Sequence, residues 1–206
     1  MNDKQSRGRL VVVSGPSGVG KGTVLKEVLH STQYVYSVSA TTRLPREGEV
    51  HGVDYFFIEK KEFETLIENG GLLEYAEYNG NYYGTPKHFV EQNVAQGLNV
   101  ILEIEVMGAM QIKRIFPNSL FVFIAPESVV ELEKRLRERA TEAEEIILDR
   151  LKIARRELAS CLMYDYIIIN RCGKQKQAAS DILSAVRAEK LKPSEVYPEI
   201  TDFFME

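Results

Sequence analysis

The sequence predicts an α/β fold in three layers, with a parallel central sheet and helices on both of its faces. Short apolar runs recur along the chain and helix-like segments separate them, which is the pattern of a parallel sheet. Residues 37–88 break this alternation, because they are rich in Tyr, Thr and Gly and contain only short strand-like runs. We therefore expect a small mixed α+β region inserted into the main domain.

The expected elements follow from the spacing of apolar residues. Parallel strands are buried on both faces, so the core strands should be continuous apolar runs: residues 10–13, 100–104, 120–124 and 166–169. The clearest helical spacing covers residues 23–30, 128–139, 142–160 and 181–190. In the insertion, residues 55–58 and 72–78 are strand-like, and the Asn79-Gly80 pair that follows is typical of a hairpin turn. The tail, residues 193–206, could dock on the body or extend from it.

Composition narrows the class of protein. A chain of 206 residues suits one domain, with or without an insertion. The net charge of −4 does not favour nonspecific binding to nucleic acid. Cys161 and Cys172 lack metal-site spacing, and we interpret both as reduced thiols, although a disulfide between them is possible. Residues 1–9 are polar and no apolar run approaches the roughly 20 residues of a membrane span, so we expect a soluble, cytoplasmic protein with no membrane partner.

A phosphate-binding loop follows the first expected strand and opens the first expected helix. Its residues are Gly15, Pro16, Ser17, Gly18, Val19, Gly20, Lys21, Gly22 and Thr23. Glycines let backbone amides face a phosphate, the helix N-terminus adds positive potential, and Lys21 adds a charge for the β and γ phosphates. The alternative is a glycine-rich turn of an unrelated α/β protein, which the lysine and the strand–loop–helix context disfavour.

One position of this loop departs from the usual phosphate-loop pattern. The residue after the lysine is normally Ser or Thr, whose hydroxyl reaches Mg²⁺, but here it is Gly22. The Gly-Lys-Gly-Thr form resembles the loops of nucleoside monophosphate kinases. In that class Mg²⁺ would rest mainly on phosphates and water, with no direct protein ligand, which suits its preference for a hydrated shell.

A second anion site is predicted in the insertion. Arg43 and Arg46 lie three residues apart, with Tyr55 downstream, and two guanidinium groups and a phenol can clamp a phosphate monoester. Glu49 could hold one of these arginines in place. A solvated polar loop explains this segment alone about equally well.

Taken together, these motifs resemble those of guanylate kinases over nearly the whole chain. The resemblance rests on residues 14–23, 37–55, 73–78, 80–85, 102–105, 123–126 and 135–139 and on Arg150. It implies transfer of the γ-phosphoryl group of Mg-ATP to GMP in purine nucleotide metabolism, by a monomer or small homo-oligomer. It also implies a P-loop core (residues 1–36, 89–126 and 151–206), a GMP-binding insertion (37–88) and a helical lid (127–150).

The resemblance assigns roles to individual positions. It implies that the GMP phosphate is held by Arg43, Arg46, Tyr55 and Tyr83, and that guanine is read by Ser39, Glu74 and Thr85. The residues that meet ATP or the transferring phosphoryl group would be Lys21, Arg135, Arg139, Arg150 and, near adenine, Asn170. Within these sets, catalysis would rest on Lys21, Arg43, Arg139 and Arg150.

Two acids end the expected strand at residues 99–105. Strand alternation would place Glu103 and Glu105 on the same face, at the end of a parallel strand where α/β proteins bind ligands. Glu103 is the candidate for the Mg²⁺ water shell or the ribose side of GMP. Glu105 stands where the family usually has aspartate, a guanine contact, and Met107 stands where it usually has glutamine, so the role of Glu105 stays open.

Several alternatives remain at this stage. The chain could be a kinase for another nucleoside monophosphate, a non-enzymatic guanylate-kinase-like module that binds proteins, or a nucleotide-dependent regulator. The arginines of residues 135–139 could form a solvated, salt-bridged helix face, which is the commoner meaning of such a run. Glu74, taken alone, would be read as a surface residue on a strand.

Overall fold

The computed structural model describes residues 8–78, 80–138 and 144–200, and side chains as far as 197. The chain divides into two compact units. The first contains Met1–Ser14 and Ser31–Ser119, and the second contains Gly15–His30 and Leu120–Glu206. Among the helices described, none is both long and apolar enough to cross a membrane.

The parallel strands of the first unit are β1 (Leu10–Ser14), β2 (Tyr34–Tyr36) and β7 (Asn99–Glu103), in the order β2-β7-β1. Leu10 pairs with Val100, and Tyr34 pairs with Asn99. Most side chains of β1 and β7 are fully buried, which explains why both strands are continuous apolar runs. Helices α3 (Lys87–Ala95) and α4 (Val106–Ile115) contact these strands, α3 at β7 and α4 at β1.

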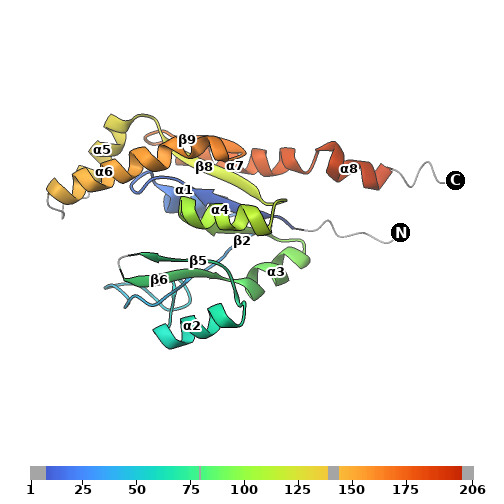
Figure 1. Ribbon diagram of the computed structural model, residues 1–206. Helices are drawn as coiled ribbons and strands as arrows, with labels where there is room; N and C mark the ends of the chain where they lie inside the picture. The colour runs from blue at the N-terminus through green and yellow to red at the C-terminus, as the bar shows by residue number, and fades with distance from the viewer. Residues whose placement is uncertain (1–7, 79, 139–143, 201–206) are drawn as a thin grey trace. The chain divides into compact units, whose positions relative to one another are not determined.

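The first unit also holds the expected mixed sheet. Its strands are β3 (Ala40–Thr41), β4 (Phe56–Phe57), β5 (Leu72–Tyr78) and β6 (Asn81–Pro86), in the order β4-β3-β6-β5. The predicted hairpin is the antiparallel pair β5–β6 (Figure 1). Gly80 in its turn has φ 72°. Helix α2 (Lys60–Glu68) packs on this sheet through the buried Phe63, whose ring stacks on Tyr82 at 5.3 Å.

The second unit contains two parallel strands and most of the helices. Strands β8 (Leu120–Pro126) and β9 (Tyr166–Asn170) pair from Val122–Tyr166 to Pro126–Asn170. The helices are α1 (Lys21–Val28), α5 (Val129–Glu138), α6 (Glu144–Ala159), α7 (Gln175–Glu189) and α8 (Pro193–Ile200), with a 3₁₀ turn at Cys161–Met163. Helix α1 packs against α7, and α7 also contacts β8 and β9.

The expected α/β class is therefore confirmed, with two corrections to its elements. Helix α7 begins at Gln175, not at residue 181, because its polar first turns carry too few apolar residues to show a period. The strand expected to reach Glu105 ends at Glu103, and Glu105 is the N-cap residue of α4. As expected, both cysteines are free thiols, with Cys172 exposed and Cys161 half-buried.

Candidate active site

The phosphate-binding loop joins β1 to α1, as the sequence predicts. Gly15 and Gly20 have φ angles of 153° and 91°, which favour glycine. Both are also places of close approach, because a Cβ at Gly15 would lie 2.2 Å from the Ile124 carbonyl oxygen, and one at Gly20 would lie 2.8 Å from Nδ2 of Asn170. The glycines thus let the loop fold tightly against β8 and the end of β9.

Lys21, the first residue of α1, turns back over this loop. Its ammonium group donates to the carbonyl oxygens of Gly15, at 2.7 Å, and of Pro16, at 3.4 Å. The lysine is therefore held across the loop by the loop's own backbone. These weak neutral acceptors leave it able to exchange them for phosphate oxygens, which form stronger charge-assisted bonds.

Arg135 and Asn170 hold the crest of the loop from two other elements. The carbonyl oxygen of Val19 accepts a bond from Nδ2 of Asn170 at 2.8 Å and one from Nη1 of Arg135 at 3.2 Å. The Arg135 guanidinium also donates to the Asn170 carbonyl oxygen at 3.1 Å and pairs with Glu131 at 3.0 Å. Asn170 is buried and its Oδ1 has no hydrogen-bond partner among the described residues.

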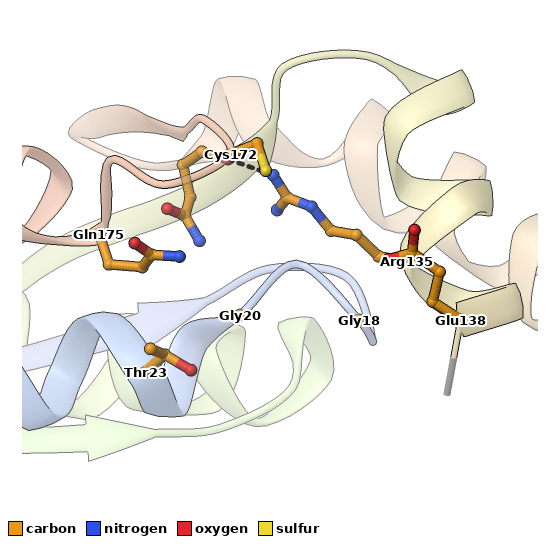
Figure 2. Close-up of a pocket in the computed structure, with 8 residues that line it drawn as sticks. Gly18, Gly20, Thr23, Arg135, Glu138, Cys172 and Gln175 are labelled. Carbon is orange, nitrogen blue, oxygen red and sulfur yellow. Dashed lines mark hydrogen bonds between the residues drawn. The ribbon is translucent and has the colours of Figure 1, made fainter. Parts of the chain in front are cut away.

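A pocket opens beside this loop, and Figure 2 shows the side chains that line it. Its wall is formed by Gly18, Gly20, Thr23, Arg135, Glu138, Asn170, Cys172 and Gln175. Five of these eight are residues that the sequence assigned to ATP. Glu138, Cys172 and Gln175 were missed because they belong to no motif. Glu138 ends α5, Gln175 begins α7, and Cys172 lies in the segment between β9 and α7.

The arginines of α5 differ in their contacts: one lies at the phosphate loop and another lies on a salt-bridged helix face. Arg135 contacts the loop, as described above, whereas Arg137 is exposed and pairs with Glu133 and Glu144. Such surface pairs add little stability. Arg139 lies outside the described residues. Arg150 lies half-buried on α6, and α6 contacts α5.

In the first unit, Arg43 is held in a fixed orientation. Its two terminal nitrogens donate to the two carboxylate oxygens of Glu49, each at 2.9 Å, and Glu49 also accepts a bond from the Arg46 amide at 2.7 Å. The hydrogen bond from Arg43 is the main cause that lowers the pKa of Glu49. Glu49 thus pairs with an arginine, as expected, and keeps the guanidinium in place.

Two tyrosines complete this cluster. The Arg43 guanidinium lies 5.5 Å from the centre of the Tyr55 ring and 5.7 Å from that of Phe57. Tyr55 in turn meets Tyr83 edge to face at 6.0 Å. The structure therefore brings together three of the four residues expected at the GMP phosphate, while the side chain of Arg46 is exposed at the rim. Phe57 was missed because an aromatic residue on a strand carries no distinctive signal.

Glu74 and Thr85 form a buried polar pair. Thr85 is fully buried, Glu74 is 6% exposed, and the Thr85 hydroxyl donates to Oε1 of Glu74 at 2.6 Å. Burial raises the pKa of the Glu74 carboxyl, the Thr85 bond opposes this rise, and the charge of Glu105 adds to it. Glu74 is thus far from a surface residue, which corrects that alternative. Ser39, the third expected base reader, is half-buried next to β3.

A β-bulge aims Glu74 inward. Leu72 pairs with Pro86 and Tyr75 with Gly84, so β5 has one more residue than β6 over this stretch. The extra residue breaks strand alternation and lets the consecutive Leu73 and Glu74 both be buried. Bulges of this kind commonly redirect a side chain next to a ligand site.

The two acids after β7 take different positions. Glu103 ends the strand, half-buried, and its carboxylate accepts a bond from the Tyr36 hydroxyl at 3.4 Å. Glu105 is exposed at the start of α4. The prediction that strand alternation aligns the two is wrong, because the chain turns into a helix between them. Since its charge affects Glu74, Glu105 lies near the buried pair.

Known proteins match this chain closely. The sequence profile of one family, described as guanylate kinase, matches residues 7–189. The chain belongs to the guanylate kinase family. It is 47% identical over 205 residues to a guanylate kinase of Bacillus cereus strain ZK, covering 97% of this chain and 98% of that one. It is 49% identical over 196 residues to a guanylate kinase of Bacillus subtilis strain 168, covering 94% and 95%.

A solved guanylate kinase has the same fold. The crystal structure of guanylate kinase from Anaplasma phagocytophilum superposes with a TM-score of 0.75 at 37% identity, covering 91% of this chain and 88% of that one. Guanylate kinases are ATP-dependent nucleoside monophosphate kinases, so the chain is assigned to an enzyme family of phosphotransferases. The non-enzymatic alternative is accordingly not favoured.

Proposed function

We propose that this chain transfers the γ-phosphoryl group of Mg-ATP to the phosphate of GMP, giving ADP and GDP. The observation that carries the choice of GMP is the buried Glu74–Thr85 pair. Guanine presents N1–H and N2–H₂ side by side, and a carboxylate accepts two parallel donors. Adenine has no N1–H and would leave the carboxylate poorly paired. A buried polar group without its hydrogen bonds reduces the free energy of binding.

The Arg43 cluster is proposed to hold the GMP phosphate. Its guanidinium is fixed by Glu49 and faces Tyr55, and Tyr83 lies alongside. A phosphate would be held by Arg43, by the phenols of Tyr55 and Tyr83, and by Arg46 from the rim. An arginine fixed in place loses less rotamer entropy when it binds, which favours a specific complex.

The pocket beside the phosphate loop is proposed to hold ATP. The loop amides and Lys21 would bind the phosphates, while Asn170 and Arg135 would support the loop and border the nucleotide.

Mg²⁺ prefers oxygen donors and keeps several waters. Glu103 has a half-buried carboxylate at the end of β7. We propose that this carboxylate would hold waters of Mg²⁺, while the ion itself would rest on phosphates and water. When bound, the ion would neutralise charge on the β and γ phosphates of ATP.

The reaction needs little acid–base chemistry. An oxygen of the GMP phosphate is already anionic, so it can attack the γ-phosphorus directly, and the bond to the ADP oxygen breaks in line. The protein's contribution is to position the phosphates and to neutralise charge through Lys21, Arg43 and the lid arginines. Residues 37–88 as GMP-binding insertion and 127–150 as lid remain part of this proposal. We also propose that the protein is cytoplasmic, is a monomer or small homo-oligomer, and acts on free nucleotides.

The direct test is release of ADP from ATP and Mg²⁺ with and without GMP, with the GMP product identified by chromatography. We expect ADP and GDP to form in equal amounts and only when GMP is present. ADP formed at the same rate without GMP would indicate a hydrolase and contradict the proposal.

Replacing Arg150 with alanine should act on the transition state. An arginine that meets the transferring phosphoryl group is worth about 10³ to 10⁵ in rate in related enzymes, whereas a surface arginine is worth almost nothing. We expect Arg150→Ala to lower kcat by at least about a hundredfold, with little change in the KM for GMP. Arg155→Ala, an exposed position on the same helix, is the control. If Arg150→Ala turns over within a few-fold of the parent, the lid role is wrong.

The affinity for GMP should fall at acidic pH because of Glu74. Burial raises the pKa of this carboxyl in the free protein, and only the ionised form accepts both guanine donors. The loss of affinity should therefore begin at a higher pH than for an exposed glutamate, whose pKa is about 4.3. The stability of the ligand-free protein should change in the opposite sense, because a raised pKa contributes stability at low pH that is lost as pH rises through it.

Titration calorimetry with GMP across the acidic range measures this dependence. The GMP phosphate itself titrates near pH 6, to judge from the second pKa of about 6 of phosphate monoesters, so Glu74→Gln is the control. The difference between the parent and this variant reports Glu74 alone. Identical pH profiles for the two proteins would show that Glu74 does not contact the ligand.

A further inference from the structure

Gly108 lies where helix α4 passes the Glu74 carboxylate. A Cβ at Gly108 would be 2.5 Å from Oε2 of Glu74, 3.2 Å from its Cδ and 3.4 Å from Cδ1 of Ile104. The first distance is far below any normal contact, so only glycine leaves room for this carboxylate in its present position. Gly108 is itself buried, so a side chain there could not turn outward to solvent.

The backbone conformation gives no other reason for a glycine here. Gly108 is the third residue of α4 and is not among the described glycines with positive φ. Glycine is less favourable than alanine inside a helix, so its presence at an ordinary helical position is a local disadvantage. The close approach of Glu74 explains why the disadvantage is tolerated.

A second contact fastens the same helix beside Glu74. The Gln111 side chain donates through Nε2 to the Tyr75 carbonyl oxygen at 3.0 Å and accepts from the Tyr75 amide at 3.4 Å. Gln111 lies three residues after Gly108, so both residues face the same side of the helix. Tyr75 follows Glu74 directly on β5. The two hydrogen bonds between Gln111 and the Tyr75 backbone therefore set the spacing between Gly108 and the Glu74 carboxylate.

The carboxylate is thus confined on two sides. Thr85 holds Oε1 at 2.6 Å, and the first turn of α4 borders Oε2. The backbone of Glu74 is also closely packed at the β-bulge, because a Cβ at Gly84 on the neighbouring strand would lie 2.9 Å from the Glu74 carbonyl oxygen. Because both carboxylate oxygens are held in place, their remaining lone pairs point in fixed directions. Recognition of two parallel donors requires such fixed directions.

We propose that Gly108 is a specificity-determining residue and Gln111 a positioning residue for base recognition, which together set the orientation of the Glu74 carboxylate toward guanine. This inference rests on the proposed function. A methyl group at position 108 would displace Oε2 and misalign the pair of bonds to N1–H and N2–H₂. Contacts to the phosphates of either nucleotide would be unaffected.

The test is the steady-state kinetics of Gly108→Ala and Gln111→Ala with GMP and with IMP, which lacks the N2 amine. We expect Gly108→Ala to raise the KM for GMP about ten- to a hundredfold, the range for one or two hydrogen bonds, with kcat and the KM for ATP near the parent's. The preference for GMP over IMP should shrink by a similar factor. Gln111→Ala should shift both quantities in the same direction but less.

A compensating variant separates positioning from general damage. Glu74→Asp shortens the side chain by one methylene, so it withdraws the carboxylate from the methyl group that Gly108→Ala adds. Glu74→Asp and Gly108→Ala should therefore be strongly non-additive in the double variant, as expected for two groups in contact. Met107→Ala, an exposed neighbour on α4, controls for changes to the helix and should leave all constants unchanged.

The outcomes are distinct. A folded Gly108→Ala with the parent's KM for GMP and GMP/IMP ratio overturns the inference while leaving the proposed function intact. If Gly108→Ala does not fold, Gln111→Ala carries the test, and an unchanged GMP/IMP ratio there overturns the inference. A parent protein that does not phosphorylate GMP overturns both the proposed function and this inference.

Discussion

Replacing Lys21 with alanine is expected to lower kcat by about a thousandfold or more while the fold is retained. Removing one group that stabilises transition-state charge typically lowers the rate by about 10² to 10³. Removing the full positive charge of a lysine beside the transferring phosphoryl group should lower the rate at least as much. The lysine is held by the loop carbonyls of Gly15 and Pro16, so its charge is already in place before ATP binds. The variant removes that charge and leaves the glycines of the loop unchanged.

The control for this variant is Lys26→Ala. Lys26 lies in the last turn of the same helix and is exposed, so its loss changes the net charge equally without touching the loop. Circular dichroism and a thermal melt establish that both variants are folded. Normal turnover in a folded Lys21→Ala would show that the loop is not the phosphate site of ATP.

Replacing Glu74 with glutamine should have a comparable effect on kcat/KM for GMP. Two charge-assisted hydrogen bonds are worth about 1.5 to 3 kcal/mol each, and every 1.4 kcal/mol is tenfold, so the loss should be on the order of a thousandfold. Glutamine keeps the volume and still offers Thr85 an acceptor, so the buried hydroxyl is not left unpaired. Its amide would present at most one acceptor to two guanine donors.

Steady-state kinetics with GMP and with ATP as the varied substrate measure this effect. The loss should fall on the GMP constants, and the KM for ATP should stay near the parent's. Glu77→Gln, an exposed position on the same strand, is the matched control. A Glu74→Gln variant with parental GMP kinetics would remove Glu74 from the base site.

The parts of the fold that sequence predicted well are those with local signals. Continuous apolar runs located β1, β7, β8 and β9, and Asn79-Gly80 located the hairpin that joins β5 to β6. The phosphate loop was recognised because its glycines and lysine serve a local backbone geometry. Helices α2, α3 and α4 were not predicted, since their short amphipathic patterns lie close to strands and turns.

What the sequence could not predict depends on contacts between distant residues. The bulge that buries Glu74 arises from the pairing of β5 with β6, and one extra residue there leaves no mark in composition. Arg135 contacts Val19 across 116 residues, so nothing local separates it from Arg137, which pairs with Glu133 and Glu144 at the surface. The need for glycine at position 108 likewise comes from a carboxylate on another element.

The most direct test of the account is the ratio of kcat/KM values for GMP and AMP, measured by ADP release with ATP and Mg²⁺, with CMP and UMP in parallel. A site that recognises its substrate through hydrogen bonds in a buried pocket can discriminate by about 10⁴ or more. The account predicts a preference for GMP of that order over each of the other three nucleotides. Equal kcat/KM values for GMP and AMP would contradict the assignment of Glu74 and Thr85 as readers of guanine.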